Sequence, residues 1–314
     1  MVMCHVTSAI DQAYEPRLCS HLHPRAHAWS IMDMRNGVKS LKKLLLFLET
    51  ATPSQLLTLN RLGPKMRDRI LSLREKGPIT LKDLTSIKWV TSNSLALWSG
   101  DNNVKKILNS YCYAIETYGD KYPNSVTSID LGTKVVTFTS LLREEGVHLK
   151  EWQQFEVIFK PYELMSSYDQ ISELFSLLPK TDAYLLERQS HRTLKFPNAG
   201  FLQASLLLRI EEAILYSIGK ERNMTIHTIS PLKVGQYFEL ETHPKKKRSA
   251  VAMVKRLIGD KDKEGIVTPF GNTLVVTPEF REFYIDERKL DDYSDSILQG
   301  IAFLEWIELS HLLK

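Results

Sequence analysis

The chain has 314 residues, of which 43% are hydrophobic and 25% are charged, and its formal net charge is +4 at pH 7. This length corresponds to about two domains of roughly 150 residues each, and the apolar content is sufficient for buried cores. No apolar run approaches the roughly 18 to 20 residues of a membrane-spanning helix, so we expect no membrane span. The mild positive charge permits nucleic-acid binding without requiring it. The cysteines, Cys4, Cys19 and Cys112, are too few for a disulfide framework, which fits a reducing compartment.

Residues 1–37 show no sustained hydrophobic period and are predicted to be a leader outside the folded domains. Arg17, Arg25 and Arg35 among few acidic residues are typical of an organelle transit segment. The histidines and the acids are more typical of a disordered tail, and composition leaves both explanations open. The cysteines and histidines here lack the compact pair spacing of zinc ligands, so we predict no zinc site.

Residues 38–117 are predicted to be a small all-α domain with an internal near-repeat. Residues 52–74 and residues 78–97 each give a helix, a tight turn and a second helix. This pattern resembles tandem helix-hairpin-helix units, whose glycine-rich turn leaves backbone N–H groups at a helix N-terminus free to hold a phosphate.

The two turns keep different parts of that hairpin motif. The first keeps Gly63, which Pro64 and Lys65 follow, and it has Arg61 in place of the motif's first glycine. In the second turn both glycines are replaced, by Trp89 and by a threonine two residues later. We therefore expect nucleic-acid contact by Arg61, Gly63 and Lys65, with a helical domain that packs on a partner as the alternative.

Residues 118–125 (YGDKYPNS) are polar and rich in turn formers, and they are predicted to be a linker. Residues 126–314 then alternate between period-2 and helical patterns. The predicted strands are residues 126–130, 134–142, 152–158, 183–186 and 225–229, and the predicted helices are residues 167–178, 199–219, 247–258 and 294–313. A strand meander followed by alternating helices and strands predicts an α/β domain with a mixed sheet.

Four acidic residues of this domain lie where an apolar segment ends or begins. Asp130 and Glu187 each end an apolar strand, and Asp292 and Asp295 lie three apart at the start of an apolar helix, on one face. Such a set is typical of a two-metal phosphodiesterase, in which paired Mg²⁺ or Mn²⁺ ions activate water. The aspartates also have an ordinary explanation, because acids suit the first turn of a helix.

Several segments of the α/β domain resemble two related families, the fungal mitochondrial Holliday-junction resolvases and the mitochondrial transcription elongation factors. The segments are IDLGTK (residues 129–134), LLERQ with the arginine three residues on (185–192), LLLRIEEAILYSI (206–218), KKKRSAVAMVKRLI (245–258) and DSILQGIAF (295–303). The resemblance implies a ribonuclease H-like (RuvC-type) fold for residues 126–314.

The elongation factors match more of the chain, from about Ser40 to Leu309, because they carry helix-hairpin-helix units before a resolvase-like domain. ETATPSQLLTLNRLG, LPKTDAYLLER, VGQYFEL and YSDSILQGIAFLE are similar to this family in the same order. The resemblance implies a factor of the mitochondrial matrix and nucleoid that dimerises through the resolvase-like domain. It also implies binding to the mitochondrial RNA polymerase and to the DNA and RNA of its elongation complex, without a required cofactor.

The alternative implied by the resolvases is a divalent-metal-dependent endonuclease that acts on four-way junctions. The elongation factors have generally lost part of the acid set, whereas this sequence keeps all four acids. In the nuclease interpretation these acids bind Mg²⁺ or Mn²⁺, and basic side chains bind phosphates; those residues are Arg188, Arg192, Lys245, Lys246, Lys247 and Arg248. The basic run also fits a solvated loop or a nuclear targeting signal.

Overall fold

The computed structural model describes residues 31–109, 122–157, 164–188, 199–241, 245–259, 265–286 and 290–313. The predicted leader up to residue 30, residues 118–121 of the predicted linker, and Arg192 lie outside these ranges. Among the described residues, no helix is long and apolar enough to cross a membrane.

The helical region begins at Ile31, earlier than the start predicted at residue 38. Met34, Val38 and Leu41 are buried at helical spacing, so the amphipathic pattern already begins inside the segment assigned to the leader. The helices are α1 (Ile31–Thr50), α2 (Pro53–Leu56), α3 (Pro64–Arg74), α4 (Leu81–Ser86) and α5 (Ser92–Ser99). Residues 103–109 are also helical.

Three of these short helices begin with the same local interaction. Thr52, Thr80 and Thr91 cap α2, α4 and α5, and each threonine hydroxyl accepts a hydrogen bond from the backbone N–H three residues on. Such a cap stabilises a helix start by about 1 kcal/mol. The capped starts explain why helices of four to eight residues form in this region. The two predicted helix–turn–helix pairs are present as α2–α3 and α4–α5.

The second part of the chain contains a six-stranded mixed sheet in the order β5-β4-β1-β2-β3-β6. Its strands are β1 (Ser125–Leu131), β2 (Val135–Arg143), β3 (Val147–Glu156), β4 (Ala183–Glu187), β5 (Ile226–Ile229) and β6 (Leu274–Val275). β2 is antiparallel to both of its neighbours, and all other pairs are parallel. The predicted α/β class, with a mixed sheet and flanking helices, is confirmed.

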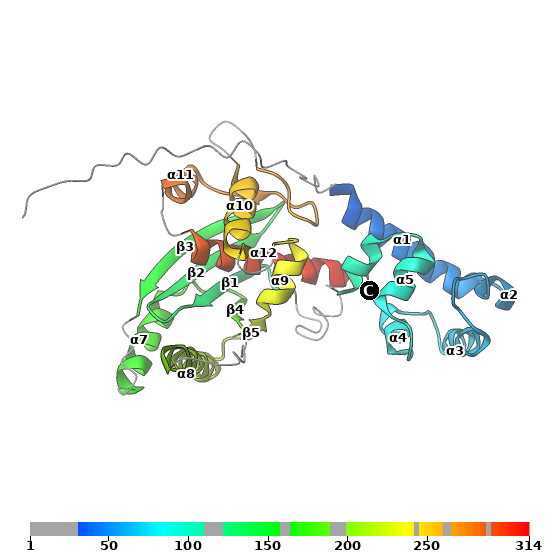
Figure 1. The fold of residues 1–314 in the computed structure, drawn as a ribbon, viewed down its shortest axis with the longest axis horizontal. Coiled ribbons are helices and arrows are strands. Elements are labelled where there is room, and N and C mark those ends of the chain that lie inside the picture. The colour runs from blue at the N-terminus through cyan, green and yellow to red at the C-terminus, as the bar shows by residue number, and fades with distance from the viewer. Residues whose placement is uncertain are drawn as a thin grey trace, which may run out of the picture. The chain divides into compact units, whose positions relative to one another are not determined.

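Helices cover both faces of this sheet (Figure 1). α7 (Leu164–Leu177) and α8 (Ala199–Glu221) pack on one face, where Ile129, Phe138 and Leu215 belong to one buried cluster. α12 (Asp291–Leu312) crosses the other face. The helices α9 (Pro231–Tyr237), α10 (Lys246–Ile258) and α11 (Pro278–Asp286) complete the domain.

The alternation of side chains along β1 decides which residues reach α12. Ile129 and Leu131 point into the cluster under α7 and α8, so Ser128 and Asp130 point to the face that α12 covers. α12 approaches this face closely at Gly300, where an added Cβ atom would lie 2.6 Å from the Leu141 Cδ1 atom. This close packing positions the first turns of α12 beside the carboxyl ends of β1 and β4.

Candidate functional site: an acid cluster and a helical hairpin pair

The sheet register brings the two strand acids together. β1 and β4 are parallel neighbours, and Ile129 pairs with Leu186 one residue before each acid. Asp130 and Glu187 therefore leave adjacent strands at the same edge of the sheet, and both side chains are half-buried. The two carboxylates are therefore neighbours because the apolar residues that precede them pair in the sheet.

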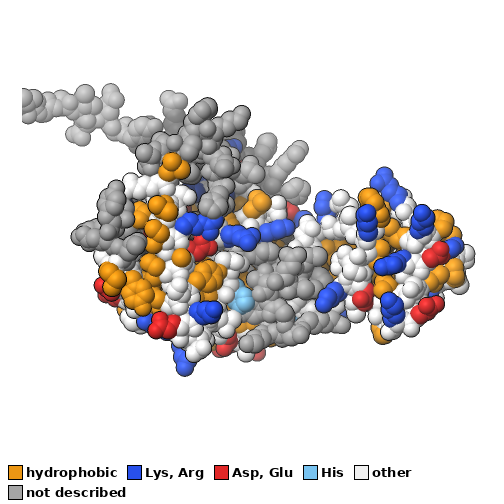
Figure 2. Space-filling model, turned by 90° about the horizontal axis from the view of Figure 1, so that it is seen from below, with side chains coloured by type: hydrophobic (Ala, Val, Ile, Leu, Met, Phe, Trp, Pro, Cys, Tyr) orange, Lys and Arg blue, Asp and Glu red, His pale blue; other side chains and the backbone are white. Residues whose placement is uncertain are grey.

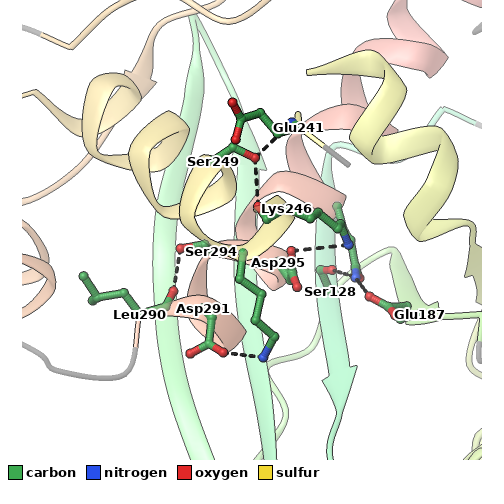
Figure 3. Close-up of polar contacts among 11 residues, drawn as sticks. Ser128, Glu187, Glu241, Lys246, Ser249, Leu290, Asp291, Ser294 and Asp295 are labelled. Atoms are coloured by element: carbon green, nitrogen blue, oxygen red, sulfur yellow. Dashed lines mark hydrogen bonds and ion pairs between the residues drawn. The ribbon is translucent and has the colours of Figure 1, made fainter. Parts of the chain in front are cut away.

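An amide from α12 bridges β1 and β4 at this edge. The Ser128 Oγ atom donates to the Gln299 Oε1 atom at 3.2 Å, and the Gln299 Nε2 atom donates to the Glu187 Oε2 atom at 2.6 Å (Figure 3). Since hydrogen bonds to ionised groups are stronger than neutral ones, this bridge fixes the Glu187 carboxylate toward Gln299.

Most of the basic run lies in the first turn of α10, beside the start of α12, so it is helical rather than the loop of the alternative interpretation. The Lys246 Nζ atom is 3.9 Å from the Asp295 Oδ1 atom, and Lys247 forms an ion pair with Asp291 (Figure 3). Lysines at a helix N-terminus oppose the helix dipole, whereas aspartates there are favoured. The pairing of the two helix starts offsets the unfavourable position of the lysines.

The acids interact strongly through charge. Burial raises the pKa of Asp130 well above its ordinary value, and the negative charges of Glu187, Asp295 and Asp292 raise it further. Burial and Asp295 raise the pKa of Glu187 to about 7, against the opposing effects of Lys246 and the Gln299 hydrogen bond. Burial also raises the pKa of Asp295, and Lys246 again opposes the shift. The Lys246 ammonium thus acts on all three of these carboxylates.

The chemistry of these four acids suits Mg²⁺ or Mn²⁺, but their placement does not form a two-metal site. Among the residues that the structure describes, no group of three or more acidic, histidine or cysteine side chains could hold a metal ion. One oxygen of Glu187 is occupied by the Gln299 amide, and Asp295 faces an ammonium rather than open space. The predicted acid set is therefore brought together as a charged cluster without the geometry of a metal centre.

The other predicted basic contacts are dispersed. Lys245 precedes α10 and is exposed, as is Arg248, and Arg188 is exposed directly after β4. Arg192 lies outside the described residues.

The two hairpin turns share an unusual backbone conformation. Arg61 and Trp89 have φ angles of 64° and 84°, in the left-handed region that glycine adopts easily and other residues do not. Each residue stands where the motif has its first glycine, so the chain keeps the turn shape without the glycine. Such a conformation costs of the order of 1 to 3 kcal/mol in a residue other than glycine.

The helix starts after the two turns differ. At α5 the Thr91 hydroxyl accepts the backbone N–H of Ser94, whereas at α3 the N-cap residue is Gly63, which has no side-chain cap. Arg61, Gly63 and Lys65 are all exposed. Of the two hairpins, the first therefore leaves its helix start uncapped by a side chain, and the nucleic-acid contact expected there stays a prediction.

Two residues of the acid cluster were missed from the sequence. Gln299 and Ser128 join the elements that carry the acids, but amide and hydroxyl side chains within apolar segments gave no chemical signal. Gln299 lies four residues after Asp295, on the same helix face, and that spacing could have identified it.

No protein-family model matches the chain. Among curated proteins, it is 28% identical over 198 residues to one from Bos taurus, covering 59% of this chain and 53% of that relative. It is also 28% identical over 197 residues to one from Rattus norvegicus, covering 60% and 52%. Both relatives are mitochondrial transcription elongation factors. The predicted resemblance to these factors is thus confirmed, and the chain spans about half the length of the curated relatives it matches.

Solved structures of resolvases match part of the chain. The yeast mitochondrial Holliday junction resolvase is 19% identical with a TM-score of 0.43, covering 68% of this chain and 90% of that one. RuvC of T. thermophilus, in complex with a Holliday junction substrate, is 13% identical with a TM-score of 0.37, covering 57% and 90%.

Proposed function

We propose that this protein is a mitochondrial transcription elongation factor that binds the mitochondrial RNA polymerase and raises its processivity. The similarity to the curated elongation factors carries this proposal. In it, the protein works in the mitochondrial matrix and nucleoid and contacts the DNA and RNA of the elongation complex. Exposed Lys65, Arg188 and Arg248 supply positive charge for that contact.

The arrangement of the acid cluster supports a binding role for the resolvase-like domain. A hydrolytic two-metal site needs carboxylate oxygens free to coordinate two cations about 4 Å apart. Here Gln299 holds Glu187, and Lys246 supplies a positive charge beside Asp295. These carboxylates thus have partners within the protein itself, and in this proposal the factor works without a required metal.

A dimer is proposed through the helices that cover the other face of the sheet. Leu202 and Leu206 are 54% and 62% exposed and lie one turn apart on α8, and Met165 on α7 is 73% exposed. Large apolar side chains that recur on one helix stripe are typical of an interface. A second copy of the chain is the proposed occupant of this surface.

A run-off transcription assay with the purified mitochondrial RNA polymerase tests the function. Adding the full chain should increase the fraction of full-length transcript on a long template, and no increase would contradict the proposal.

The four retained acids favour one other function, a Mg²⁺- or Mn²⁺-dependent junction endonuclease. A synthetic four-way junction incubated with the protein and Mn²⁺ tests it. Nicking that disappears in Asp130→Asn would establish the nuclease. An intact junction together with longer transcripts would exclude it.

A further inference from the structure

The helical region has a groove between its two hairpins. The groove has a volume of about 760 Å³, and it is lined from both hairpin turns and the helices next to them. Pro64 and Met66 from the first hairpin and Ile87 from the second contribute apolar surface to it. Exposed apolar surface of this kind commonly marks a binding site for a partner.

Trp89 at the edge of this groove is exposed and strained at once. Its side chain is 74% exposed, and its φ angle of 84° is one that a glycine would adopt at lower cost. The Lys88 Nζ atom lies 5.2 Å from the centre of the indole ring. Neither packing nor backbone conformation explains a tryptophan here, so its exposed ring is best explained by contact with a ligand.

The charge around the groove selects an anionic ligand. Lys65 and Arg69 line it from the first hairpin and Lys88 lines it from the second, and no acidic side chain is among the residues that line it. Figure 2 shows Lys and Arg side chains over the face of the helical region at its right, with fewer Asp and Glu side chains among them. Positive charge on both sides of an apolar groove suits a ligand that carries charges along its length and apolar faces between them.

Single-stranded nucleic acid has this chemistry. Its phosphates can contact Lys65 and Arg69, while an unpaired base stacks on an exposed aromatic ring, a contact that tolerates any base. The bases of a duplex are stacked on one another and cannot reach the indole. We propose that the groove between the hairpins binds single-stranded DNA or RNA, with one base stacked on Trp89. This rests on the proposed function, because it names the nucleic acid that the helical region of the factor would hold.

The test uses the full chain without polymerase, so that its outcome is separate from that of the transcription assay. Fluorescence anisotropy compares a labelled 12-nucleotide thymidine strand, an abasic strand with the same phosphates, and a 12-base-pair duplex. The wild-type chain should bind the thymidine strand about 5- to 150-fold more tightly than the abasic strand, because one base stacks. Equal affinity for the two strands would overturn the proposal. So would displacement of the strand by an acidic peptide of equal charge as effectively as by unlabelled thymidine strand.

Variants assign the two parts of the contact. Trp89→Leu should abolish the preference for bases over abasic backbone, and Trp89→Phe should keep part of it. Lys65→Ala should reduce the slope of the logarithm of the binding constant against the logarithm of the salt concentration by about 0.7. Lys76→Ala, which is exposed but outside the groove lining, should leave this slope unchanged. If Trp89→Leu still prefers the thymidine strand over the abasic strand to the same degree, no base stacks on Trp89.

A further variant separates binding from structure. Trp89→Gly relieves the backbone strain, so this variant should unfold at or above the wild-type temperature while it loses the base preference. A large fall in the unfolding temperature would show that Trp89 is needed for folding, and would overturn its assignment as a ligand contact.

Discussion

Glu305 of α12 is a completely buried carboxyl whose protonation should control the stability of the α/β domain. Its side chain is 0% exposed. The Tyr237 hydroxyl donates to the Oε2 atom at 2.7 Å, the Asn272 Nδ2 atom donates to Oε1 at 3.0 Å, and Thr268 also donates to Oε1. Burial raises the pKa of Glu305 from 4.5 to about 7, although these hydrogen bonds oppose the shift.

The sign of the effect follows from proton linkage. Between pH 4.5 and about 7 the folded chain holds a proton that the unfolded chain has lost, so stability falls as pH rises through this window. With those two pKa values, the free energy of unfolding should fall by about 2 kcal/mol between about pH 5.5 and about pH 8. Glu305→Gln, which has no proton to lose, should not show this contribution.

Urea denaturation followed by circular dichroism at both pH values measures the effect. Other buried carboxyls also titrate, so the informative quantity is the difference between wild type and variant at each pH. The variant should gain about 2 kcal/mol relative to wild type on going from the lower to the higher pH. A difference that is independent of pH would refute the assignment of a raised pKa to Glu305.

Three further predictions test the site, the dimer and the packing. Lys246→Met should raise the pKa of Glu187 above about 7, followed by nuclear magnetic resonance of its carboxyl carbon, because the Lys246 ammonium opposes the rise that burial and Asp295 cause. Lys247→Met is the matched control, and an equal rise there would contradict the role given to Lys246. Leu206→Asp should convert a dimer to a monomer in light scattering, while Leu46→Asp, at a leucine 61% exposed on α1, should not. Gly300→Ala should lower the free energy of unfolding by about 1 to 3 kcal/mol through overpacking against a buried leucine of β2, and an unchanged urea midpoint would contradict that close approach.

The strands and acids of the α/β domain could be predicted because each has a local signal. Alternating apolar and polar residues predicted β1 and β2. Asp130 and Glu187 were predicted as site residues because each is the acid at the end of an apolar strand. β6, with two residues, and the short helices α9 and α11 were not predicted, since segments of that length show too few repeats of a period. The boundaries of β3 also differ, because its first residues, Val147–Leu149, pair with β2 across a bulge.

The contacts of the candidate site were less accessible from the sequence. The distance between the Lys246 ammonium and Asp295 depends on how two helix starts meet, and no sequence pattern specifies a crossing of that kind. The exposure of Trp89 was also unpredictable, because a tryptophan near a turn is compatible with burial. Pattern predicts which residues share a strand or a helix face, and tertiary packing decides which of them meet.

The position of α12 in the chain has a consequence for folding. Every strand of the sheet precedes it, yet α12 covers the sheet face that carries Ser128 and Thr139. Tyr284 of α11 stacks on Trp152 of the same face, but Ser128 and Thr139 stay uncovered until residues 291–312 leave the ribosome, so the domain should pass through a stage with a partly exposed sheet. Chaperone dependence, and aggregation of chains stalled before α12, would follow from that order of synthesis.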